Sequence, residues 1–323
     1  MSTLRAIRRR ILTPKMSETS LDVRGFYKKD PQAQENLETV GKSFLTGYAY
    51  AVEAKNVAEA EQRLEQWDRP YRGFAYEGAG MGFAMLDGLP LGGSNHLQRF
   101  LDSRGRHHAY MVYIGQGWAM ARLPRFRWSR ITVADPLMRW LVLDGFGFHQ
   151  AYFRTEQYVN KQYQEPEFPW PTEGQRWYSN HAIDQGIGRA LWFVGGTDAP
   201  RVADMIDRFD DARKPDLWSG AGLVATYAGG VDEAELRGFF ERAGSYRPNL
   251  AQGSAFAATA RIEAGLLLPH TSVATGVFCG MSPQDASAVS SNNRPVTSDE
   301  ADLPLYEQWR RNIAGTFASL ERI

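Results

Sequence analysis

Apolar residues recur at intervals of three and four along most of this chain. Leu37, Val40 and Phe44 form one such series. This period is typical of an amphipathic helix that buries one face. Strand-like alternation is weak, and its best candidate, residues 110–114, can equally be a buried helix segment. The pattern therefore predicts an all-α protein.

A pair of small residues separated by one position recurs along the chain, followed by aromatic residues and alanines. The second members of these pairs, taken as markers, are Gly47, Gly80, Gly117, Gly147, Gly188, Gly222 and Ala255. Consecutive markers are 33, 37, 30, 41, 34 and 33 residues apart, which is the spacing of helix-pair repeats. We predict a single domain built as a tetratricopeptide-like α-solenoid, in which the small residues let two helix backbones approach. A dinucleotide-binding fingerprint is the alternative, but no strand precedes the glycines and no copy completes its six-residue pattern.

Four segments follow from these patterns. Residues 1–30 form a basic N-terminal segment, 31–290 the helical repeat domain, 291–304 a polar linker and 305–323 a C-terminal helix. A proline-rich, aromatic insertion near 161–180 explains the long interval of 41 residues between two markers. We interpret the chain as one continuous unit.

Charge and cysteine content bear on the possible partners and on the cellular compartment. The chain has 37 basic and 37 acidic residues, so we expect no general attraction to nucleic acid. The single cysteine, Cys279, excludes an internal disulfide and is compatible with a reducing compartment, so we expect a cytoplasmic location. No run approaches the roughly 20 apolar residues that span a bilayer.

The first fifteen residues combine positive charge with apolar positions. Arg5, Arg8 and Arg9 alternate with Ile7 and Ile11 at helical spacing, without the apolar core and cleavage site of a secretory signal. Two interpretations stay open. Residues 1–15 could make peripheral contact with an anionic membrane or a partner helix, or they could pack on the chain's own repeats.

Several short strings carry a resemblance to a known family. They are RGFAYEG at 72–78, HAYMV at 108–112, GQGWA at 115–119, DGFGFH at 144–149, DQG at 184–186, DLWSG at 216–220, YRP at 246–248 and PHT at 269–271. Over about residues 24–280 the chain resembles an uncharacterised family, catalogued as a domain of unknown function, that recurs in bacterial enediyne polyketide gene clusters.

The resemblance implies a pathway but no catalytic residues. It implies a part in the maturation of the polyene released by the enediyne synthase into the warhead core. Other accessory proteins of the pathway, one of them integral to the membrane, are the implied partners. The family has no motif of established catalytic role, so no residue receives a function from it.

Three carboxylates form the first candidate site. Glu77, Asp144 and Asp184 lie one or two positions before a glycine of a marker pair. Equivalent positions in stacked repeats line one surface, so we expect these acids to approach His149 and Arg189. Such an acid/base cluster would contain like charges that raise some pKa values. The alternative is that each carboxylate caps the N-terminus of a helix.

Aromatic residues gather at the same markers. Tyr76, Trp118, Trp192, Trp218 and Tyr227 lie at or close to marker pairs. In a helical array, aromatic residues opposite glycines can leave an apolar groove suited to a long conjugated hydrocarbon. Core packing would explain the same residues.

Histidines complete the candidate ligand-binding residues, through His108 and His270. No two histidines have the spacing of a metal-binding pair on one helix face, and ligands would have to converge from separate repeats. We therefore assign no metal ligand, and the sequence identifies no cofactor.

Three functions remain open. The leading one is an accessory protein of enediyne core biosynthesis that binds, presents or co-processes a polyene or another hydrophobic polyketide intermediate. The alternatives are a metal- or acid/base-dependent enzyme acting on the polyene, and a scaffold that joins pathway proteins. A carrier would have a long apolar tunnel, an enzyme would have histidines and carboxylates converging in a closed cavity, and a scaffold would have an open concave face.

Overall fold

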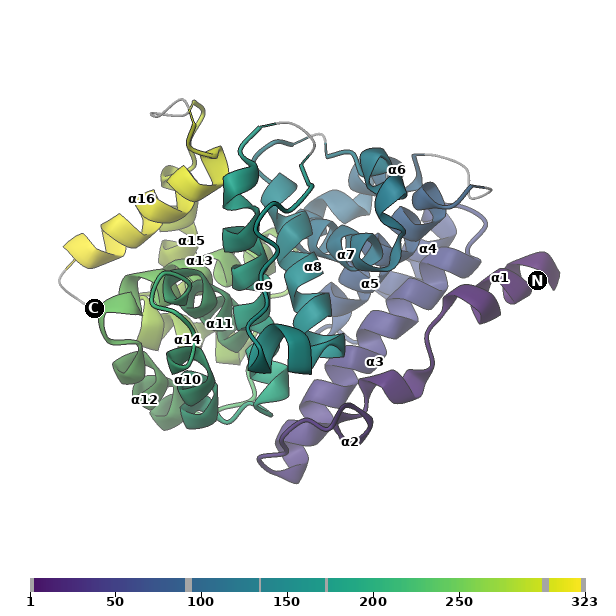
Figure 1. Ribbon diagram of the computed structural model, residues 1–323. Helices are drawn as coiled ribbons and strands as arrows, with labels where there is room; N and C mark the ends of the chain where they lie inside the picture. The colour runs from purple at the N-terminus through teal and green to yellow at the C-terminus, as the bar shows by residue number, and fades with distance from the viewer. Residues whose placement is uncertain (1–2, 91–94, 134, 172–173, 298–301, 321–323) are drawn as a thin grey trace.

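The marker residues lie in a series of inner helices that follow one another through the molecule (Figure 1). The computed structural model describes residues 3–90, 95–133, 135–171, 174–297 and 302–320, and these ranges contain no strand. The predicted all-α fold is thus confirmed. The inner helices are α3 (Pro31–Glu53), α5 (Arg72–Gly88), α7 (Ala109–Arg122), α8 (Arg139–Phe153), α9 (Ser179–Val194), α11 (Lys214–Ala228) and α13 (Arg247–Glu263).

The glycines of the marker pairs lie where neighbouring inner helices contact each other. A Cβ on Gly115 of α7 would lie 2.0 Å from the carbonyl oxygen of Glu77 in α5, and one on Gly117 would lie 1.9 Å from that of Val142 in α8. Residues two apart in a helix point about 200° apart around its axis, so the two glycines face opposite neighbours. Any larger residue would push two backbones apart.

A second row of shorter helices covers part of the inner series. It comprises α4 (Val57–Glu65), α6 (His96–Leu101), α10 (Ala199–Asp207), α12 (Glu233–Ala243) and α14 (Pro269–Phe278). α10 packs on α12, and α12 packs on α14. Local signals begin these helices: Asp232, for example, forms a capping box with Glu235 at the start of α12.

The helix pairing is interrupted around α8. The chain before and after α8 forms only short turns in its described part: η3 (Arg125–Arg130), the π-turn η4 (Glu156–Asn160) and η5 (Arg176–Tyr178). Residues 172–173 of the predicted insertion lie outside the described part.

The two ends of the chain pack on the inner series. α1 (Thr3–Leu12) lies on α3, followed by η1 (Met16–Thr19) and α2 (Leu21–Arg24). At the other end, α15 (Pro283–Asn292) and α16 (Leu305–Ser319) pack on α13 (Figure 1). Residues 298–301 of the predicted linker and 321–323 of the predicted C-terminal segment lie outside the described part. The remaining short turns are η2 (Arg104–His108) and η6 (Gly244–Tyr246).

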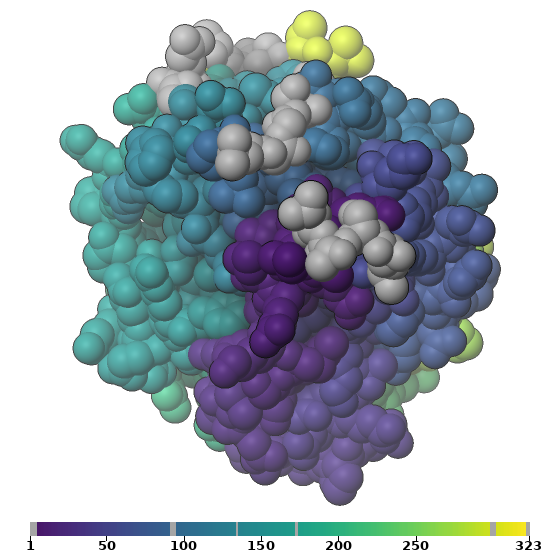
Figure 2. All heavy atoms as spheres, turned by 90° about the vertical axis from the view of Figure 1, so that its right-hand side faces the viewer, coloured from purple at the N-terminus to yellow at the C-terminus, as the bar shows by residue number. Residues whose placement is uncertain are grey.

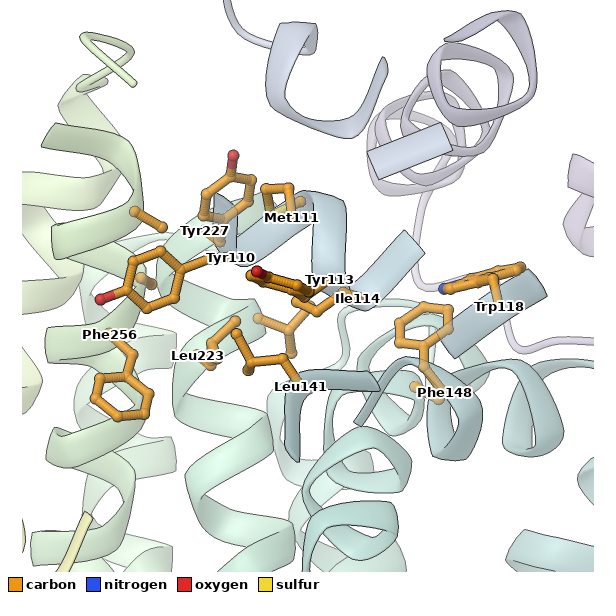
Figure 3. Close-up of a cluster of buried hydrophobic side chains, with 14 of the residues drawn as sticks. Tyr110, Met111, Tyr113, Ile114, Trp118, Leu141, Phe148, Leu223, Tyr227 and Phe256 are labelled. Carbon is orange, nitrogen blue, oxygen red and sulfur yellow. The ribbon is translucent and has the colours of Figure 1, made fainter. Parts of the chain in front are cut away.

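The inner series also curves back on itself. The rings of Phe74 in α5 and Tyr227 in α11 lie 5.2 Å apart, edge to face. The rings of Tyr110 in α7 and Phe256 in α13 lie 6.3 Å apart (Figure 3). Side chains from the start and the end of the series therefore meet in one common centre.

Candidate functional site

A cluster of charged side chains lies in this centre, between α5, α8 and α9. Arg189 of α9 hydrogen-bonds through Nη1 to Oδ1 of Asp144 in α8. Its Nη2 lies 3.9 Å from Oε1 of Glu77 in α5, and these side chains are at most 5% exposed. One buried guanidinium is thus shared, unequally, by two buried carboxyl groups.

Two further polar groups complete the surroundings of Asp144. Gln185 donates through Nε2 to Oδ2 of Asp144 at 2.7 Å, and the same amide lies 2.9 Å from the hydroxyl of Tyr306. Sequence reasoning missed both. Gln185 precedes the first glycine of its pair directly, as Glu77 and Asp144 do, so counting from that glycine would have found it. Tyr306 comes from α16 and carries no such signal.

Glu77 has a pKa close to neutral pH. Burial raises the pKa of Glu77 to about 7, Asp144 adds to the increase, and the attraction of Arg189 offsets only part of it. The indole of Trp118 lies beside the carboxyl group. A raised pKa together with a specific charged partner is typical of functional carboxyl groups.

A cavity of about 60 Å³ opens beside Glu77 and Arg189. A water molecule needs about 10–15 Å³ of such space, so the cavity holds a few waters or a slender group. Its walls are mainly aromatic and aliphatic and come from six of the inner helices: Phe44, Phe74, Met111, Trp118, Phe148, Tyr152, Phe193, Leu223, Val224 and Tyr227. Figure 3 shows Trp118 and Phe148 facing each other from neighbouring helices.

One polar atom in the cavity wall, the hydroxyl of Tyr227, is buried without a hydrogen bond to any described residue. Nε1 of Trp118, in contrast, lies next to the carboxyl group of Glu77. Buried polar groups in folded proteins usually have partners, and an unpaired one is costly. A ligand with a small polar group would supply a partner for the Tyr227 hydroxyl.

Residues 14–19, which we call the strap, cover the outer end of the cavity. Glu18 and Thr19 line the cavity there, and the hydroxyl of Tyr152 donates to the backbone oxygen of Glu18 at 3.3 Å. A Cβ on Gly41 of α3 would lie 2.9 Å from Cβ of Thr19, so this glycine lets the strap lie close to α3. In Figure 2 the strap belongs to the dark purple segment that crosses the face between α3 and the teal residues.

The structure distributes the predicted site residues over several places. Glu77, Trp118, Arg189 and Tyr227 line the cavity, and Asp144 joins them through Arg189. The other predicted residues do not line the cavity: Tyr76, His108, His149, Asp184, Trp192, Trp218 and His270.

The expectation that Asp184 shares a surface with Glu77 and Asp144 is wrong. Both oxygens of Asp184 pair with Arg213, at 2.6 and 2.9 Å, and one also accepts from Gln164 at 2.9 Å. Asp184 is one residue away from the position equivalent to Glu77, which turns its side chain about 100° around the helix axis. Burial raises the pKa of Asp184 to about 6.

Two of the candidate histidines, His108 and His149, pack against aromatic rings. His108 stacks on Tyr76 with centroids 3.6 Å apart, and His149 lies edge to face with Trp118 at 5.5 Å. Burial lowers the pKa of each histidine to about 3. Both are therefore uncharged near neutral pH, which disfavours the expected role of His149 as an acid/base partner of the carboxylates.

The remaining predicted residues hold the rows of helices together. Nε1 of Trp192 donates to the carbonyl oxygen of Gly229 at 3.0 Å, and the ring of Trp218 packs on Phe239 at 4.9 Å. His270 hydrogen-bonds through Nε2 to a backbone carbonyl at 3.1 Å beside a second hollow.

The described residues offer no metal centre. Within them, histidine, cysteine, aspartate and glutamate side chains do not gather in any group of three or more that could hold a metal ion.

Three of the four arginines of α1 have partners within the molecule. Arg5 and Arg9 form ion pairs at 3.1 Å with carboxylates of α4 and α3, and Arg8 donates to backbone carbonyls at and after the end of α3. Ile7 and Ile11 are 48% and 74% exposed. In the described ranges, no helix combines the length and the apolar character needed to cross a membrane.

Comparison with known proteins assigns a family. Residues 3–317 match the family described as "Protein of unknown function (DUF1702)". No curated protein and no solved structure matches the chain. The family match includes the inner helices, the cavity and the strap. The chain therefore belongs to the DUF1702 family of proteins of unknown function.

Proposed function

We propose that this protein binds a slender, apolar, conjugated molecule in the central cavity, between the strap and the pair formed by Glu77 and Arg189. The observation that carries this proposal is a cavity with mainly aromatic and aliphatic walls and the pair of Glu77 and Arg189 at its inner end. Aromatic side chains offer large contact areas to planar conjugated chains. Sites for small molecules are mostly apolar, with a few polar groups that orient the ligand.

The resemblance to proteins of enediyne polyketide clusters supplies the ligand class and the pathway. We propose an accessory protein of enediyne core biosynthesis that binds, presents or co-processes a polyene or another hydrophobic polyketide intermediate. Other accessory proteins of the pathway, including one integral to the membrane, are its proposed partners. The fit of a conjugated chain to the aromatic walls supports this proposal.

A polyene needs more room than the present cavity offers, and outward movement of the strap would provide it. The present cavity, at about 60 Å³, has space for a few water-sized groups. Glu18 and Thr19 close its outer end, and the hydrogen bond from Tyr152 to Glu18 is 3.3 Å long. Such surface segments open at a lower free-energy cost than core helices.

Glu77 favours a second candidate function, acid/base catalysis on the bound polyene. A carboxyl group with a pKa of about 7 can donate and accept a proton near neutral pH. Protonation of one carbon by Glu77, followed by removal of a proton from another carbon, would shift double bonds without an oxidant or a metal. The scaffold hypothesis gains no comparable support.

The binding proposal is tested with diphenylhexatriene, a slender conjugated hydrocarbon without charge. We expect its fluorescence to rise on binding and the wild-type protein to bind it. Val40→Phe places a bulky ring at the outer end of the cavity, which Val40 lines, and should abolish binding. Val273→Phe makes the same exchange at an exposed position of α14 and should bind like wild type. If Val40→Phe folds and binds normally, the cavity is not the site.

The pathway is tested in a producing host that lacks this gene. Complementation with wild type should restore the enediyne core, and Val40→Phe should not. Glu77→Gln separates the two candidate functions. A variant that binds diphenylhexatriene but yields no core product supports catalysis, and one that binds and restores the product supports a carrier.

A further inference from the structure

One buried arginine lacks a counter-charge. Four arginines are buried in the described part of the chain. Arg189, Arg213 and Arg310 each form an ion pair with a buried aspartate. Arg261 of α13 is 1% exposed and pairs with no carboxylate of the described residues. A guanidinium removed from water without an opposite charge is costly.

The partners of Arg261 are neutral. Nη1 donates to the backbone oxygen of Pro70 at 3.1 Å and Nη2 to that of Tyr227 at 2.5 Å. The guanidinium carbon lies 3.9 Å from the centre of the Tyr227 ring, whereas Nε has no hydrogen-bond partner. Of the five N–H groups of a guanidinium, these bonds use two. The other three N–H groups, that of Nε among them, have no acceptor among the described residues.

Arg261 lines a hollow of about 590 Å³ that is distinct from the central cavity. Tyr71, Phe74 and Leu268 contribute apolar walls to this hollow. Phe74 lines both spaces and thus belongs to the wall between them. The hollow can therefore receive an apolar body next to a cation.

The other charged groups around the hollow are already engaged. Asp30 and Asp232 accept backbone N–H groups as caps of α3 and α12, and Glu235 pairs with Lys29. His270 hydrogen-bonds to a backbone carbonyl, and burial lowers its pKa. Arg261 is thus the cation without a counter-charge in this hollow. The three acids repel a multiply charged anion more strongly than a monoanion.

We propose that this hollow binds a small organic carboxylate with an apolar body, whose carboxylate pairs with Arg261. A carboxylate accepts two parallel N–H bonds from the guanidinium fork and supplies the missing charge. The apolar body lies against Tyr71, Phe74 and Leu268. This second site is independent of the polyene proposal, because its evidence is the unpaired arginine.

The probes are octanoate and octan-1-ol, with binding followed by the chemical shift of carbon-13 at their first carbon. We expect wild type to bind octanoate at least about tenfold more tightly than the alcohol, because a charge-assisted bidentate contact is lost in the alcohol. Arg261→Met should lose this preference. Arg237→Gln, which removes one charge from an exposed pair on α12, should keep it.

Asn36→Asp keeps the test valid if Arg261→Met does not fold. Oδ1 of Asn36 accepts a hydrogen bond from the hydroxyl of Tyr71 at 3.3 Å, which an aspartate can also accept. The substitution adds a negative charge to the hollow and should weaken octanoate binding while leaving octan-1-ol binding unchanged.

Three outcomes would overturn the carboxylate site. They are absence of octanoate binding to wild type, equal binding of octanoate and octan-1-ol, and displacement of octanoate by inorganic phosphate at equal concentration. Diphenylhexatriene and Val40→Phe separate the two proposals. If Val40→Phe loses diphenylhexatriene but keeps octanoate, both sites stand. If wild type binds diphenylhexatriene but not octanoate, only the carboxylate-site proposal is contradicted.

Discussion

Oε1 of Glu77 lies 3.9 Å from Nη2 of Arg189, beyond hydrogen-bonding distance, while the same guanidinium hydrogen-bonds to Asp144. One buried cation thus faces two buried carboxyl groups and compensates one of them better than the other. Glu77 is the less compensated group, and its pKa is raised to about 7. The proton on Glu77 is therefore part of the folded state in mildly acidic solution.

Glu77→Gln should change how stability depends on pH. The pKa of Glu77 rises from 4.5 to about 7 on folding, so its contribution to stability is fully present below pH 4.5 and is lost as the pH rises through 7. Glutamine resembles the protonated acid and does not titrate. From pH 5 to pH 8 we expect the variant to gain roughly 2–3 kcal/mol relative to wild type.

Chemical denaturation of both proteins at these two pH values provides the measurement. Glu233→Gln, which removes an exposed carboxylate on α12, controls for the loss of one charge. Parallel stability curves for wild type and Glu77→Gln would contradict the role assigned to Glu77.

Gly222→Ala should destabilise the protein strongly. The new Cβ would lie 2.1 Å from the backbone oxygen of Leu250, so α11 and α13 must separate, at a cost of about 1–3 kcal/mol. Gly238→Ala on α12 meets no atom within 4 Å and should stabilise by up to about 1 kcal/mol through helix propensity. Thermal unfolding of the two variants should show shifts of opposite sign, and equal shifts would rule out close packing as the role of Gly222.

Asp184→Asn should act on stability rather than on the cavity. It would leave Arg213 buried without its carboxylate, which costs about 3–5 kcal/mol in comparable buried pairs. Asp211→Asn, at an exposed pair with Lys214, should cost less than about 1 kcal/mol. Unfolding in urea gives both values. A fully stable Asp184→Asn protein would contradict this structural role.

Gly41→Leu should open the strap. The side chain would displace Thr19, whose Cβ lies 2.9 Å from the position of a Cβ on residue 41. We expect faster association of diphenylhexatriene in stopped-flow experiments and faster proteolysis within residues 14–19. Lys42→Leu, at the exposed position that follows in α3, adds an apolar side chain and serves as the control. Unchanged association would mean that the ligand enters elsewhere.

Peripheral membrane contact through residues 1–15 remains a proposal with a direct test. Ile7 and Ile11 are exposed on α1, and we expect weak, salt-sensitive sedimentation with anionic vesicles. The contact should be weak because Arg5, Arg8 and Arg9 already have partners within the chain. Ile7→Ser combined with Ile11→Ser should abolish it. Wild type that stays in the supernatant would leave α1 with a structural role alone.

The sequence by itself determined the helices and much of their packing. Apolar residues at intervals of three and four predict amphipathic helices wherever they occur. The pairs of small residues predict close helix contacts, because residues two apart point to opposite sides of a helix and reach both neighbours. Both signals are local in the sequence. In α7, Gly115 contacts α5 and Gly117 contacts α8, as such a pair predicts.

Only the tertiary structure decided which polar groups meet. Asp184 and Gln185 are adjacent in the chain, but one residue turns a helical side chain by about 100°. Asp184 therefore pairs with Arg213, and Gln185 reaches Asp144. Tyr306 and the strap come from opposite ends of the chain to the central cluster and its cavity. Contacts between segments so far apart depend on how the inner helices curve, and no spacing within the sequence encodes that curvature.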